Sequence, residues 1–430
     1  MPTMRDNQRR GAEPSICFVA LEAYGQLAAR ADLAHIGGAE VQWSLVGREL
    51  ARRGARVSFV CWDYGQPDGV EHDGVRVFKT CNRDAGLRGV RFVYPRMTAL
   101  WGALARADAD VYFHRTADSE TGLVAAWTRR RGRAFVFSVA SDTDCERSLP
   151  RLAHLRQRAL YRYGLRRADR VIAQTTRQQR LLREQFDIAA ILVPPCGAAP
   201  DGQGSVGPPR PTGRLETCSP DAGEAPVVQG MQAGAPAVLG GAPAVQRRVL
   251  WLGRFSEVKR LELCYDVARL CPELAFDVVG DGNRGSAYEA RLRDEGARIA
   301  NVRMHGRVPH AQVGRFYDVA DALLCTSQWE GFPNTFLEAW SRGIPTVSTV
   351  EPDDVISRHR LGAVAADAPG LASALRRLLD DEDGRRDCGR RAREHFNANH
   401  GVERAVDAYL DLIEELQCRQ RTAASVSLSS

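Results

Sequence analysis

Two carboxylates, Glu330 and Glu338, are separated by seven residues. The first follows a predicted strand and a turn, and the second falls about one turn into the next predicted helix, so both can face one crevice at the carboxyl edge of a sheet. Free NH groups at the helix start carry partial positive charge and suit a phosphate. We interpret the carboxylates as acceptors for hydroxyls of a sugar and of a ribose on either side of that phosphate. The alternative is a loop charge and a solvated helix residue.

Two cations, Arg254 and Lys259, are candidates for binding the phosphates. Arg254 ends the first strand predicted in the second half of the chain, and Lys259 opens the following helix, so both can reach one site above the sheet edge. Arg binds two oxygens with a planar fork and Lys adds a mobile point charge, which together suit a diphosphate. Of the 59 basic residues only Lys79 and Lys259 are lysines, so a plain surface charge explains Arg254 more easily than Lys259.

A glycine pair, Gly37 and Gly38, opens the first predicted helix. Glycine permits positive φ and close approach of a ligand to the backbone, and the helix N-terminus behind the pair attracts phosphate. A plain turn is the alternative, but the position after the first strand favours a phosphate site.

Short apolar runs alternate with helical patterns along most of the chain. The strands that we predict are 15–22, 56–62, 75–79, 111–114, 134–139, 171–174, 248–252, 274–279, 302–308, 322–326 and 345–349. The helices that we predict most clearly are 39–53, 260–270, 286–298, 310–319, 335–341, 371–379, 385–397 and 402–417. This alternation predicts an α/β fold of two Rossmann-like domains with parallel sheets that face each other across a cleft, where ligands of open α/β sheets bind.

Composition divides the chain into four segments. We predict a first Rossmann-like domain over residues 1–197, a disordered Gly-, Ala- and Pro-rich linker insertion over 198–245, a second Rossmann-like domain over 246–418 and a disordered tail over 419–430. The insertion contains no aromatic residue and cannot bury enough apolar surface to offset its ordering entropy. The last helix of the second domain could pack back on the first.

The stretch 307–349 resembles the donor-binding core of retaining glycosyltransferases of the GT-B fold, in the family called glycosyl transferases group 1, or family 4. The resemblance rests on the Glu-x7-Glu signature, on Ala320-Asp321 at a strand start and on Gly343-Ile-Pro345 before the next strand. It implies that Glu330 contacts the donor sugar and that Glu338 binds ribose hydroxyls. The donor-binding residues that we expect are Gly37, Gly38, Arg254, Lys259, Gly280, Glu330, Gly331, Phe332, Asn334, Thr335 and Glu338.

Two neighbouring patterns bear on this resemblance. The family has Gly-Arg-x4-Lys-Gly around the cations, and the chain has Arg260 in place of the last glycine. The family also has Gly-Asp-Gly near the nucleotide, as at residues 280–282. With Gly285 this stretch has the form G-x-G-x-x-G, but a nicotinamide site would need an acid at the end of the next strand, and residues 303–306 contain none.

The resemblance implies a metal-independent glycosyltransferase that moves a sugar from a nucleotide diphosphate donor, most simply UDP or GDP, to a glycan or lipid-linked acceptor. It also implies retention of anomeric configuration and a role in polysaccharide or glycolipid biosynthesis. The first domain would hold the acceptor, and no cofactor is expected beyond the donor substrate. The rival readings are another GT-B enzyme, such as a sugar-nucleotide epimerase or a phosphorylase, and a non-catalytic scaffold that binds a sugar nucleotide or a membrane.

The residues that we expect near the reacting carbon are Glu330 and either Arg115 or Asp142. Many relatives carry a His after a strand of the first domain, whereas here His114 stands one residue earlier and Arg115 takes its place. Adjacent side chains on a strand point to opposite faces, so one of the two faces the cleft, and a buried role is the alternative for His114. Asp142-Thr-Asp144 has the D-x-D form of a metal site, but we interpret it as acceptor-side carboxylates or a loop cap.

Composition excludes several other classes of protein. With 44% apolar and 26% charged residues the chain is globular, and no apolar run approaches the ~18 residues of a spanning helix. Eleven cysteines without a C-x-x-C pair and nine scattered histidines predict reduced thiols and no protein-held metal. We see no signal peptide and expect a cytoplasmic protein without a nucleic-acid partner.

The segment 148–183 is rich in Arg and contains one acid, Asp169. Apolar side chains recur in it at helical spacing, at Leu149, Leu152, Leu155, Ala159 and Tyr163. The pattern predicts a basic amphipathic helix, and two readings explain it equally. Either it lies on an anionic membrane surface, which would make the protein peripheral on the inner face of the plasma membrane, or its apolar stripe faces the core.

Overall fold

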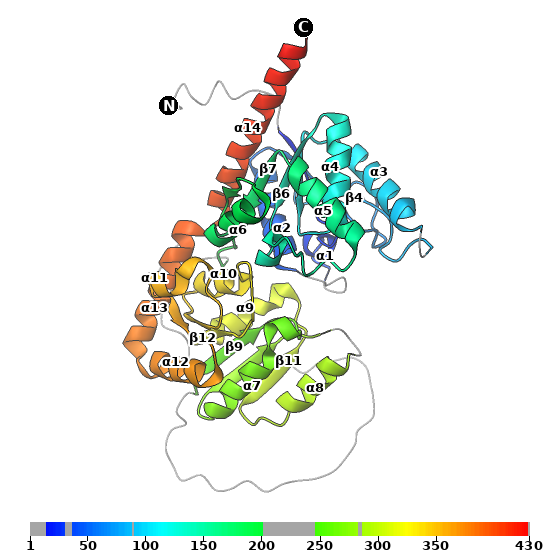
Figure 1. Cartoon of the computed structure of the whole chain (residues 1–430). Helices are drawn as coiled ribbons and strands as arrows, with labels where there is room; N and C mark the ends of the chain where they lie inside the picture. Colours follow the sequence, from blue (N-terminus) through cyan, green and yellow to red (C-terminus); the bar gives the residue numbers. More distant parts are fainter. Residues whose placement is uncertain (1–13, 31–36, 88–89, 201–245, 283–285, 429–430) are drawn as a thin grey trace, which may run out of the picture.

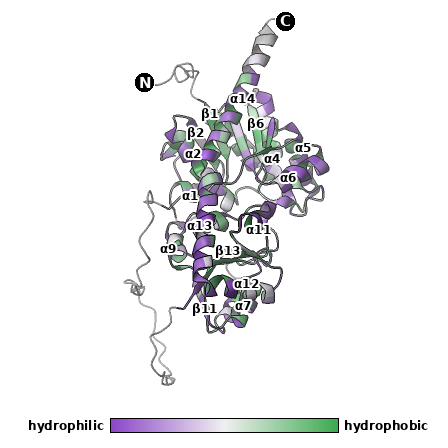
Figure 2. Ribbon diagram, turned by 90° about the vertical axis from the view of Figure 1, so that its left-hand side faces the viewer, coloured by the Kyte–Doolittle hydropathy of each residue, from purple (hydrophilic) through white to green (hydrophobic). Residues whose placement is uncertain are grey.

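The computed structural model describes residues 14–30, 37–87, 90–200, 246–282 and 286–428. They form two α/β domains, one above the other in Figure 1, with the last helix running from the second domain along the first. Apolar strands lie inside each domain, and hydrophilic helices such as α13 (Glu382–Asn399) line the outside (Figure 2). Of the linker insertion predicted over 198–245, residues 201–245 lie outside the described residues.

The first domain alternates strands and helices. Its strands are β1 (Ser15–Val19), β2 (Arg56–Cys61), β3 (Val70–His72), β4 (Val75–Lys79), β5 (Val111–Arg115), β6 (Ala134–Ser138), β7 (Arg170–Ala173) and β8 (Ile191–Leu192). Its helices are α1 (Tyr24–Leu27), α2 (Gly38–Arg52), α3 (Thr98–Ala107), α4 (Ser119–Arg131), α5 (Leu155–Arg167) and α6 (Thr176–Phe186), with short turns η2 (Phe92–Met97) and η3 (Asp142–Cys145).

The second domain repeats the alternation. Its strands are β9 (Arg248–Leu252), β10 (Ala275–Val279), β11 (Val302–Gly306), β12 (Ala322–Cys325), β13 (Thr346–Ser348) and β14 (Gly362–Val364). Its helices are α7 (Leu261–Leu270), α8 (Ala287–Gly296), α9 (His310–Val319), α10 (Asn334–Trp340), α11 (Val355–His359), α12 (Ala368–Asp380) and α13, with turns η4 (Glu257–Lys259) and η5 (Pro352–Asp354). Helix α14 (Val402–Leu428) ends the chain.

Each domain has one sheet covered on both faces. The strand orders are β3-β4-β2-β1-β5-β6-β7-β8 and β11-β10-β9-β12-β13-β14, parallel throughout except for β3. In β1, Phe18 packs towards α2 and α14, whereas Cys17 and Val19 pack towards α3 and α4. Burial on both faces explains why the strands read as continuous apolar runs. The prediction of two Rossmann-like α/β domains is confirmed.

The strand orders reverse at one point in each sheet. In the first sheet this point lies between β1 and β5, and in the second it lies between β9 and β12. Ligands of doubly wound sheets bind outside the carboxyl ends of the strands at such a point. The loops after β1, β9 and β12 carry the Gly37-Gly38 pair, Arg254 and Glu330, and Arg115 is the last residue of β5.

Helix α14 belongs to the core of the first domain although it follows the second in sequence. Trp43 Nε1 of α2 donates to the Tyr409 hydroxyl at 3.2 Å, and the Tyr409 ring lies 5.4 Å from that of Phe113 and 6.3 Å from that of Phe18. Near the end of the first domain, Gly197 N donates at 3.0 Å to His400 O, which lies between α13 and α14.

The disordered tail predicted over 419–430 is wrong for residues 419–428, because α14 continues to Leu428. This stretch contains no glycine or proline to end the helix, and its Arg, Gln and Ala residues favour helix. Gln420 also bonds the first domain through Gly132 O at 3.3 Å.

Replacing Tyr409 tests whether α14 holds the first domain together. Tyr409→Ala should lower the midpoint of thermal unfolding strongly, because truncating a buried aromatic side chain costs about 3–5 kcal/mol. Tyr409→Phe removes only the hydrogen bond and should cost about 1 kcal/mol. Asp411→Ala, at an exposed position of the same helix, is the control. A midpoint unchanged in Tyr409→Ala would mean that α14 is not a core element.

Candidate active site

Lys259 and Glu330 meet at the carboxyl ends of β9 and β12. Lys259 closes the turn η4, and Glu330 lies in the loop before α10, where Lys259 Nζ pairs with Glu330 Oε1. Ser327 Oγ donates to the same carboxylate oxygen at 2.7 Å. Burial on its own lowers the pKa of Lys259, but the charge and hydrogen bond of Glu330 raise it above its ordinary value. The amine therefore stays protonated at neutral pH.

Arg260 replaces the glycine of the family pattern, and its backbone adopts the left-handed conformation that glycine favours. Its φ is 46°, in the left-handed region that costs a non-glycine residue about 1–2 kcal/mol. The guanidinium compensates, because Nε donates to Thr326 O at 2.8 Å and Nη2 donates to Ser327 O at 3.3 Å. The turn that carries Lys259 is thereby tied to the loop that carries Glu330.

The loops after β9, β10 and β11 are bound to one another through their backbones. Gly280 N donates to Gly306 O at 2.9 Å, and Phe255 N donates to Asp281 O at 2.7 Å. Gly280 has a φ of 142°, and a Cβ there would lie 1.8 Å from Gly253 O. Glycine at this position lets the backbones approach each other and so fixes the loop that holds Arg254.

Arg254 lies between the two domains. It is exposed, yet its charge acts on Lys259 of its own domain and on Glu40 of the first domain. Burial raises the pKa of Glu40, which stands in the first turn of α2, and Arg254 opposes the rise. The glycine pair begins that helix, with Gly37 as its N-cap and Gly38 as its first residue. The predicted phosphate-binding groups of the two domains therefore face one another.

A chain of amide hydrogen bonds joins the domains beside these groups. Gln42 Nε2 of α2 donates to Asn334 Oδ1 at 2.6 Å, and Asn334 Nδ2 donates to Gly38 O at 2.7 Å. Gln42 Oε1 in turn accepts from Arg115 Nη1 and Gln174 Nε2, both at 2.9 Å. Arg115, which the sequence placed near the reacting carbon, is buried and braces this bridge. Both of these hydrogen bonds of the Asn334 side chain go to residues of the first domain.

A second contact brings Asp142 near Glu330. A Cβ on Gly331 would lie 2.6 Å from Ala140 O and 3.0 Å from Gln178 Nε2, so the two loops touch through backbone atoms. Asp142 accepts from Arg177 Nε at 2.9 Å and from Gln178 Nε2 at 3.2 Å. Burial raises the pKa of Asp142, and these two partners oppose the rise. Its carboxylate is held by groups of the first domain.

A third contact caps a helix across the junction. Thr176 N donates to Asp353 Oδ2 at 2.6 Å, and Arg177 N donates to Asp353 Oδ1 at 3.1 Å. A carboxylate at the N-terminus of α6 is stabilised by the helix dipole and by the free NH groups. The two carboxyl edges thus touch in a closed arrangement.

Glu338 lies apart from the ion pair. Its Oε1 is 3.4 Å from Nε2 of His310, the first residue of α9, and its charge raises the pKa of buried Tyr317, after burial itself. In the described part of the chain, no hydrogen bond or ion pair joins Glu338 to Arg254, Lys259 or Glu330. The structure brings the latter three together and places Glu338 further along α10.

Phe332 and Thr335 complete the predicted donor-binding set. The Phe332 ring packs 6.0 Å from the Trp340 ring and 5.2 Å from the His400 ring, near the point where the chain crosses between domains. We interpret this side chain as an anchor of the loop rather than a ligand contact. Thr335 is the second residue of α10 and is partly exposed.

Sequence reasoning missed an acidic cluster at the start of α4. His114 is buried, with Nδ1 3.0 Å from Val19 O and Nε2 2.9 Å from Asp118 Oδ1, so it points away from Arg115. Burial and the charge of Asp118 raise the pKa of Glu120 to about 7. Glu120 also lies at the carboxyl edge, since α4 follows β5. Glu120, Gln42 and Gln174 belong to no sequence motif, so no signal in the sequence could have found them.

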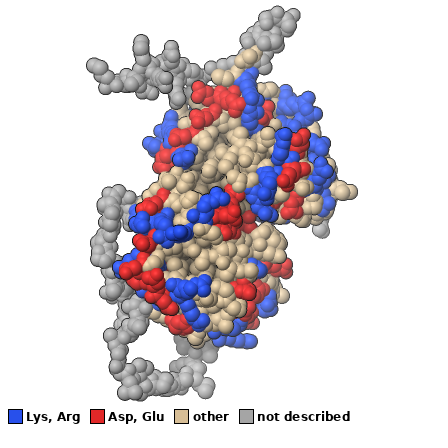
Figure 3. Space-filling model, turned by 60° about the vertical axis from the view of Figure 1, so that its left-hand side comes forward, with Lys and Arg blue, Asp and Glu red and all other residues tan. Residues whose placement is uncertain are grey.

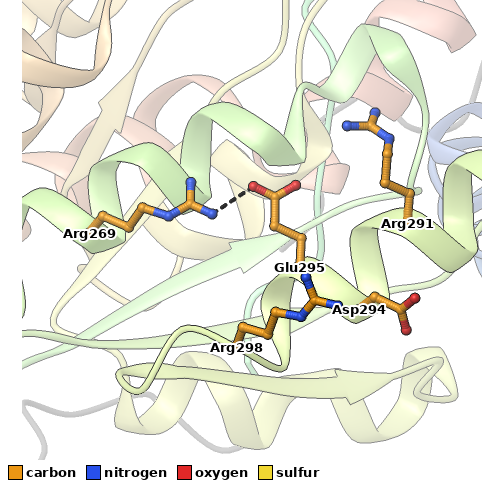
Figure 4. Close-up of a pocket in the computed structure, with 5 residues that line it drawn as sticks. All are labelled: Arg269, Arg291, Asp294, Glu295 and Arg298. Atoms are coloured by element: carbon orange, nitrogen blue, oxygen red, sulfur yellow. Dashed lines mark hydrogen bonds and ion pairs between the residues drawn. The ribbon is translucent and has the colours of Figure 1, made fainter.

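Two other features do not form a ligand site at this edge. Among the described residues, no group of three or more His, Cys, Asp or Glu could hold a metal ion. Figure 4 shows a hollow between α7 and α8, where Arg269 and Glu295 pair at 2.7 Å. Arg269, Asp294 and Glu295 stand near the C-terminal ends of these helices, at the sheet edge opposite the candidate site. This hollow is an ion-paired surface feature.

Comparison with known proteins identifies both domains. Residues 37–197 match the family model described as glycosyl transferase 4-like domain, and residues 246–381 match the model described as glycosyl transferases group 1. The chain therefore carries a domain of each of these glycosyltransferase families, in this order.

Solved structures show the same arrangement of domains. Sucrose-phosphate synthase from Thermosynechococcus elongatus superposes with a TM-score of 0.70 at 18% identity, over 95% of this chain and all of that chain. HepE from Anabaena, in complex with UDP and glucose, superposes with a TM-score of 0.66 at 14% identity, over 94% of this chain and all of that one. The fold is GT-B, as the resemblance implied.

Two relatives are similar to this chain in sequence. The lipopolysaccharide core biosynthesis glycosyltransferase LpsD of Rhizobium meliloti is 30% identical over 40% of this chain and 50% of its own length. A 2-deoxystreptamine N-acetyl-D-glucosaminyltransferase of Streptomyces fradiae is 28% identical over 87% of this chain and 90% of its own length. The chain thus spans about half the length of the first of these relatives.

Gly331→Ala tests the closed contact between the domains. The added methyl group would meet Ala140 O, a backbone atom that cannot swing away, so the two edges should separate. We expect a larger radius of gyration by small-angle X-ray scattering. Gly102→Ala is the matched control, since its Cβ would meet only the movable end of Arg106, at 3.3 Å. Identical scattering for Gly331→Ala and the unmodified chain would contradict the contact.

Proposed function

We propose that the protein is a retaining, metal-independent glycosyltransferase that transfers a sugar from a nucleotide diphosphate donor. The observation that carries the proposal is the meeting of Arg254, Lys259 and Glu330 at the switch point of the second sheet, opposite the start of α2. Such a point is the expected ligand site of a doubly wound sheet.

The cations are suited to a departing diphosphate. Negative charge builds on the leaving group as the bond to the sugar breaks, so preorganised positive groups there lower the barrier. Lys259 stays protonated because Glu330 is its partner. Arg254 is exposed and adds a forked donor, and the NH groups at the start of α2 add a dipole from the other domain. These groups can neutralise the diphosphate without a divalent cation.

The two glutamates have different roles in this proposal. Glu330 pairs with Lys259, accepts from Ser327 and lies beside the loop of Asp142. This position supports a role for Glu330 at the donor sugar, facing the acceptor domain. Glu338 stands further along α10 and would accept hydrogen bonds from ribose hydroxyls. A nucleotide sugar is long enough to contact Glu330 with its sugar and Glu338 with its ribose.

The acceptor side is proposed from the first domain. Asp142, and Arg115 through Gln42, line the junction, and Glu120 with its pKa of about 7 is a further group that titrates near neutral pH. We propose a glycan or lipid-linked acceptor in polysaccharide or glycolipid biosynthesis, with UDP or GDP in the donor. The names of relatives such as LpsD support this class. Retention is proposed from the family resemblance and would be read from the anomeric signals of the product by NMR.

Replacing Lys259 and Glu338 separates the phosphate and ribose contacts. Lys259→Ala should lower the affinity for UDP by about 10- to 100-fold, since a charge-assisted hydrogen bond contributes about 1.5–3 kcal/mol, and should leave the weak binding of uridine unchanged. Glu338→Ala should weaken both ligands. If GDP is the preferred nucleotide, GDP and guanosine replace them. Lys79→Ala, which removes the other lysine, is the control. Calorimetry measures the affinities, and an unchanged affinity for the diphosphate in Lys259→Ala would refute the clamp.

A donor panel tests the whole assignment. UDP-, GDP-, ADP- and dTDP-sugars at equal concentration should give unequal increases in the unfolding midpoint. The true donor should give the largest, because the stabilisation rises with the logarithm of the affinity. Release of the nucleoside diphosphate with a candidate glycan or lipid acceptor, in the presence of EDTA, should follow. Binding of the donor without release from any acceptor would instead support the scaffold reading.

A further inference from the structure

Large exposed apolar side chains gather on one side of the first domain. Ten such side chains are exposed among the described residues. Four of them, Leu87, Val90, Val93 and Tyr94, stand in the segment 87–94, and a fifth, Leu155, begins α5. Leu155 is 82% exposed, Leu87 is 79% exposed and Tyr94 is 71% exposed. Single exposed apolar residues are ordinary, but a group of this size indicates contact with an apolar partner.

The two segments lie side by side although about 60 residues separate them in sequence. The Arg156 guanidinium, next to Leu155, sits 3.9 Å above the ring of Phe92, which lies between Val90 and Val93. Figure 1 shows α3, α4 and α5 together on this side of the domain, away from α14. We call the five apolar residues with Arg91 and Arg156 the docking surface.

Helix α5 turns its part of the predicted apolar stripe outward, whereas Leu149 and Leu152, which precede the helix, are buried in the core. Leu155, Ala159 and Tyr163, four residues apart, are all exposed. The core face consists instead of Tyr161, Gly164 and Leu165. Helix α4 approaches that face closely, since a Cβ on Gly164 would lie 2.5 Å from a backbone oxygen. The single helix expected over 148–183 is shorter, because Pro150 and the positive φ of Leu149 keep the chain non-helical before α5.

The segment that carries Leu155 has charge of one sign. Residues 147–167 contain seven arginines and no Asp or Glu. Within the described ranges, no ion pair neutralises Arg91, Arg156, Arg162 or Arg166. In the view of Figure 3, Lys and Arg lie among Asp and Glu on both domains. A protein partner would present matched acids at fixed points, but exposed apolar groups among unpaired arginines suit a fluid anionic surface.

We propose that the docking surface binds the headgroup region of an anionic lipid bilayer. Leu87, Tyr94 and Leu155 would enter the interface, and the arginines would contact lipid phosphates, each contributing about 1 kcal/mol near such a surface. No helix in the described part of the chain is long and apolar enough to cross a bilayer. This inference does not rest on the donor chemistry.

The docking surface borders the junction between the domains. Arg151, four residues before Leu155, donates to Ser141 Oγ at 3.4 Å, and Ser141 lies against Gly331 of the second domain. The segment from Ser141 to Leu155 therefore leads from the candidate site to the docking surface. A substrate held in the bilayer would reach the site along it.

The test uses the full chain and sedimentation with vesicles. The unmodified protein should bind vesicles of phosphatidylcholine with phosphatidylglycerol, and should bind pure phosphatidylcholine far more weakly. Tyr94→Asp/Leu155→Asp should reduce binding at least 10-fold, because each buried side chain contributes about 1.5–3 kcal/mol. Arg156→Gln should reduce binding about fivefold, and only to the anionic vesicles. Leu270→Asp and Arg358→Gln, at exposed positions of the second domain, are the matched controls.

Several results would overturn the inference. These are equal binding to both kinds of vesicle, no binding to either, or a loss as large in the controls as in the docking-surface variants. A dimer seen by light scattering that disappears in Tyr94→Asp/Leu155→Asp, without vesicle binding, would assign the surface to a second copy of the chain instead. The thermal midpoint of each variant checks that it folds, and nucleotide binding should stay unchanged in all of them.

Discussion

The structure depends on one constraint: the carboxyl ends of the strands in the two parallel sheets must face each other across the junction between the domains. Each sheet places its loops at a carboxyl edge, and the amide pair Gln42 and Asn334 joins those edges at 2.6 Å. Behind the pair, Arg115 and Gln174 fix the orientation of the Gln42 side chain. Buried polar networks of this kind specify one geometry because any unpaired member would be costly. The convergence of residues from distant parts of the chain follows from that bridge.

The electrostatics of the candidate site follow from the same closeness. Lys259 would be costly to bury alone, and Glu330 makes its burial tolerable while keeping it charged. A bound diphosphate would compete with Glu330 for this amine and free the carboxylate for the sugar. Arg254, exposed and close to both domains, would supply the charge that Glu330 does not already neutralise. The ion pair is thus a resting arrangement that a doubly negative ligand can replace.

The sequence was sufficient to predict the fold, because strand and helix periods are local signals. The Glu-x7-Glu spacing is also local and indicated the loop that carries the candidate site. The sequence could not show that Arg260 adopts a glycine conformation and anchors the neighbouring loop, since that depends on Thr326 and Ser327 from another strand. The role of Gln42 was not predicted either, because a single glutamine belongs to no sequence motif with a characteristic spacing. The outward stripe of α5 also required tertiary information, because amphipathicity alone does not say which face is buried.

The connection between the domains suits a movement of the second domain relative to the first. Helix α14 packs through Tyr409 into the first domain, so the described chain returns from the second domain to the first near His400, beside Gly197. A short connection of this kind can act as a hinge about which the second domain rotates as a body. If the first domain rests on a bilayer through the docking surface, the second domain remains free to open, take up a soluble donor and close on an acceptor held at the membrane. The contacts at Gly331 and Asp353 would then form at each closure. The first is a backbone contact and the second is a pair of hydrogen bonds, so neither is a packed apolar interface.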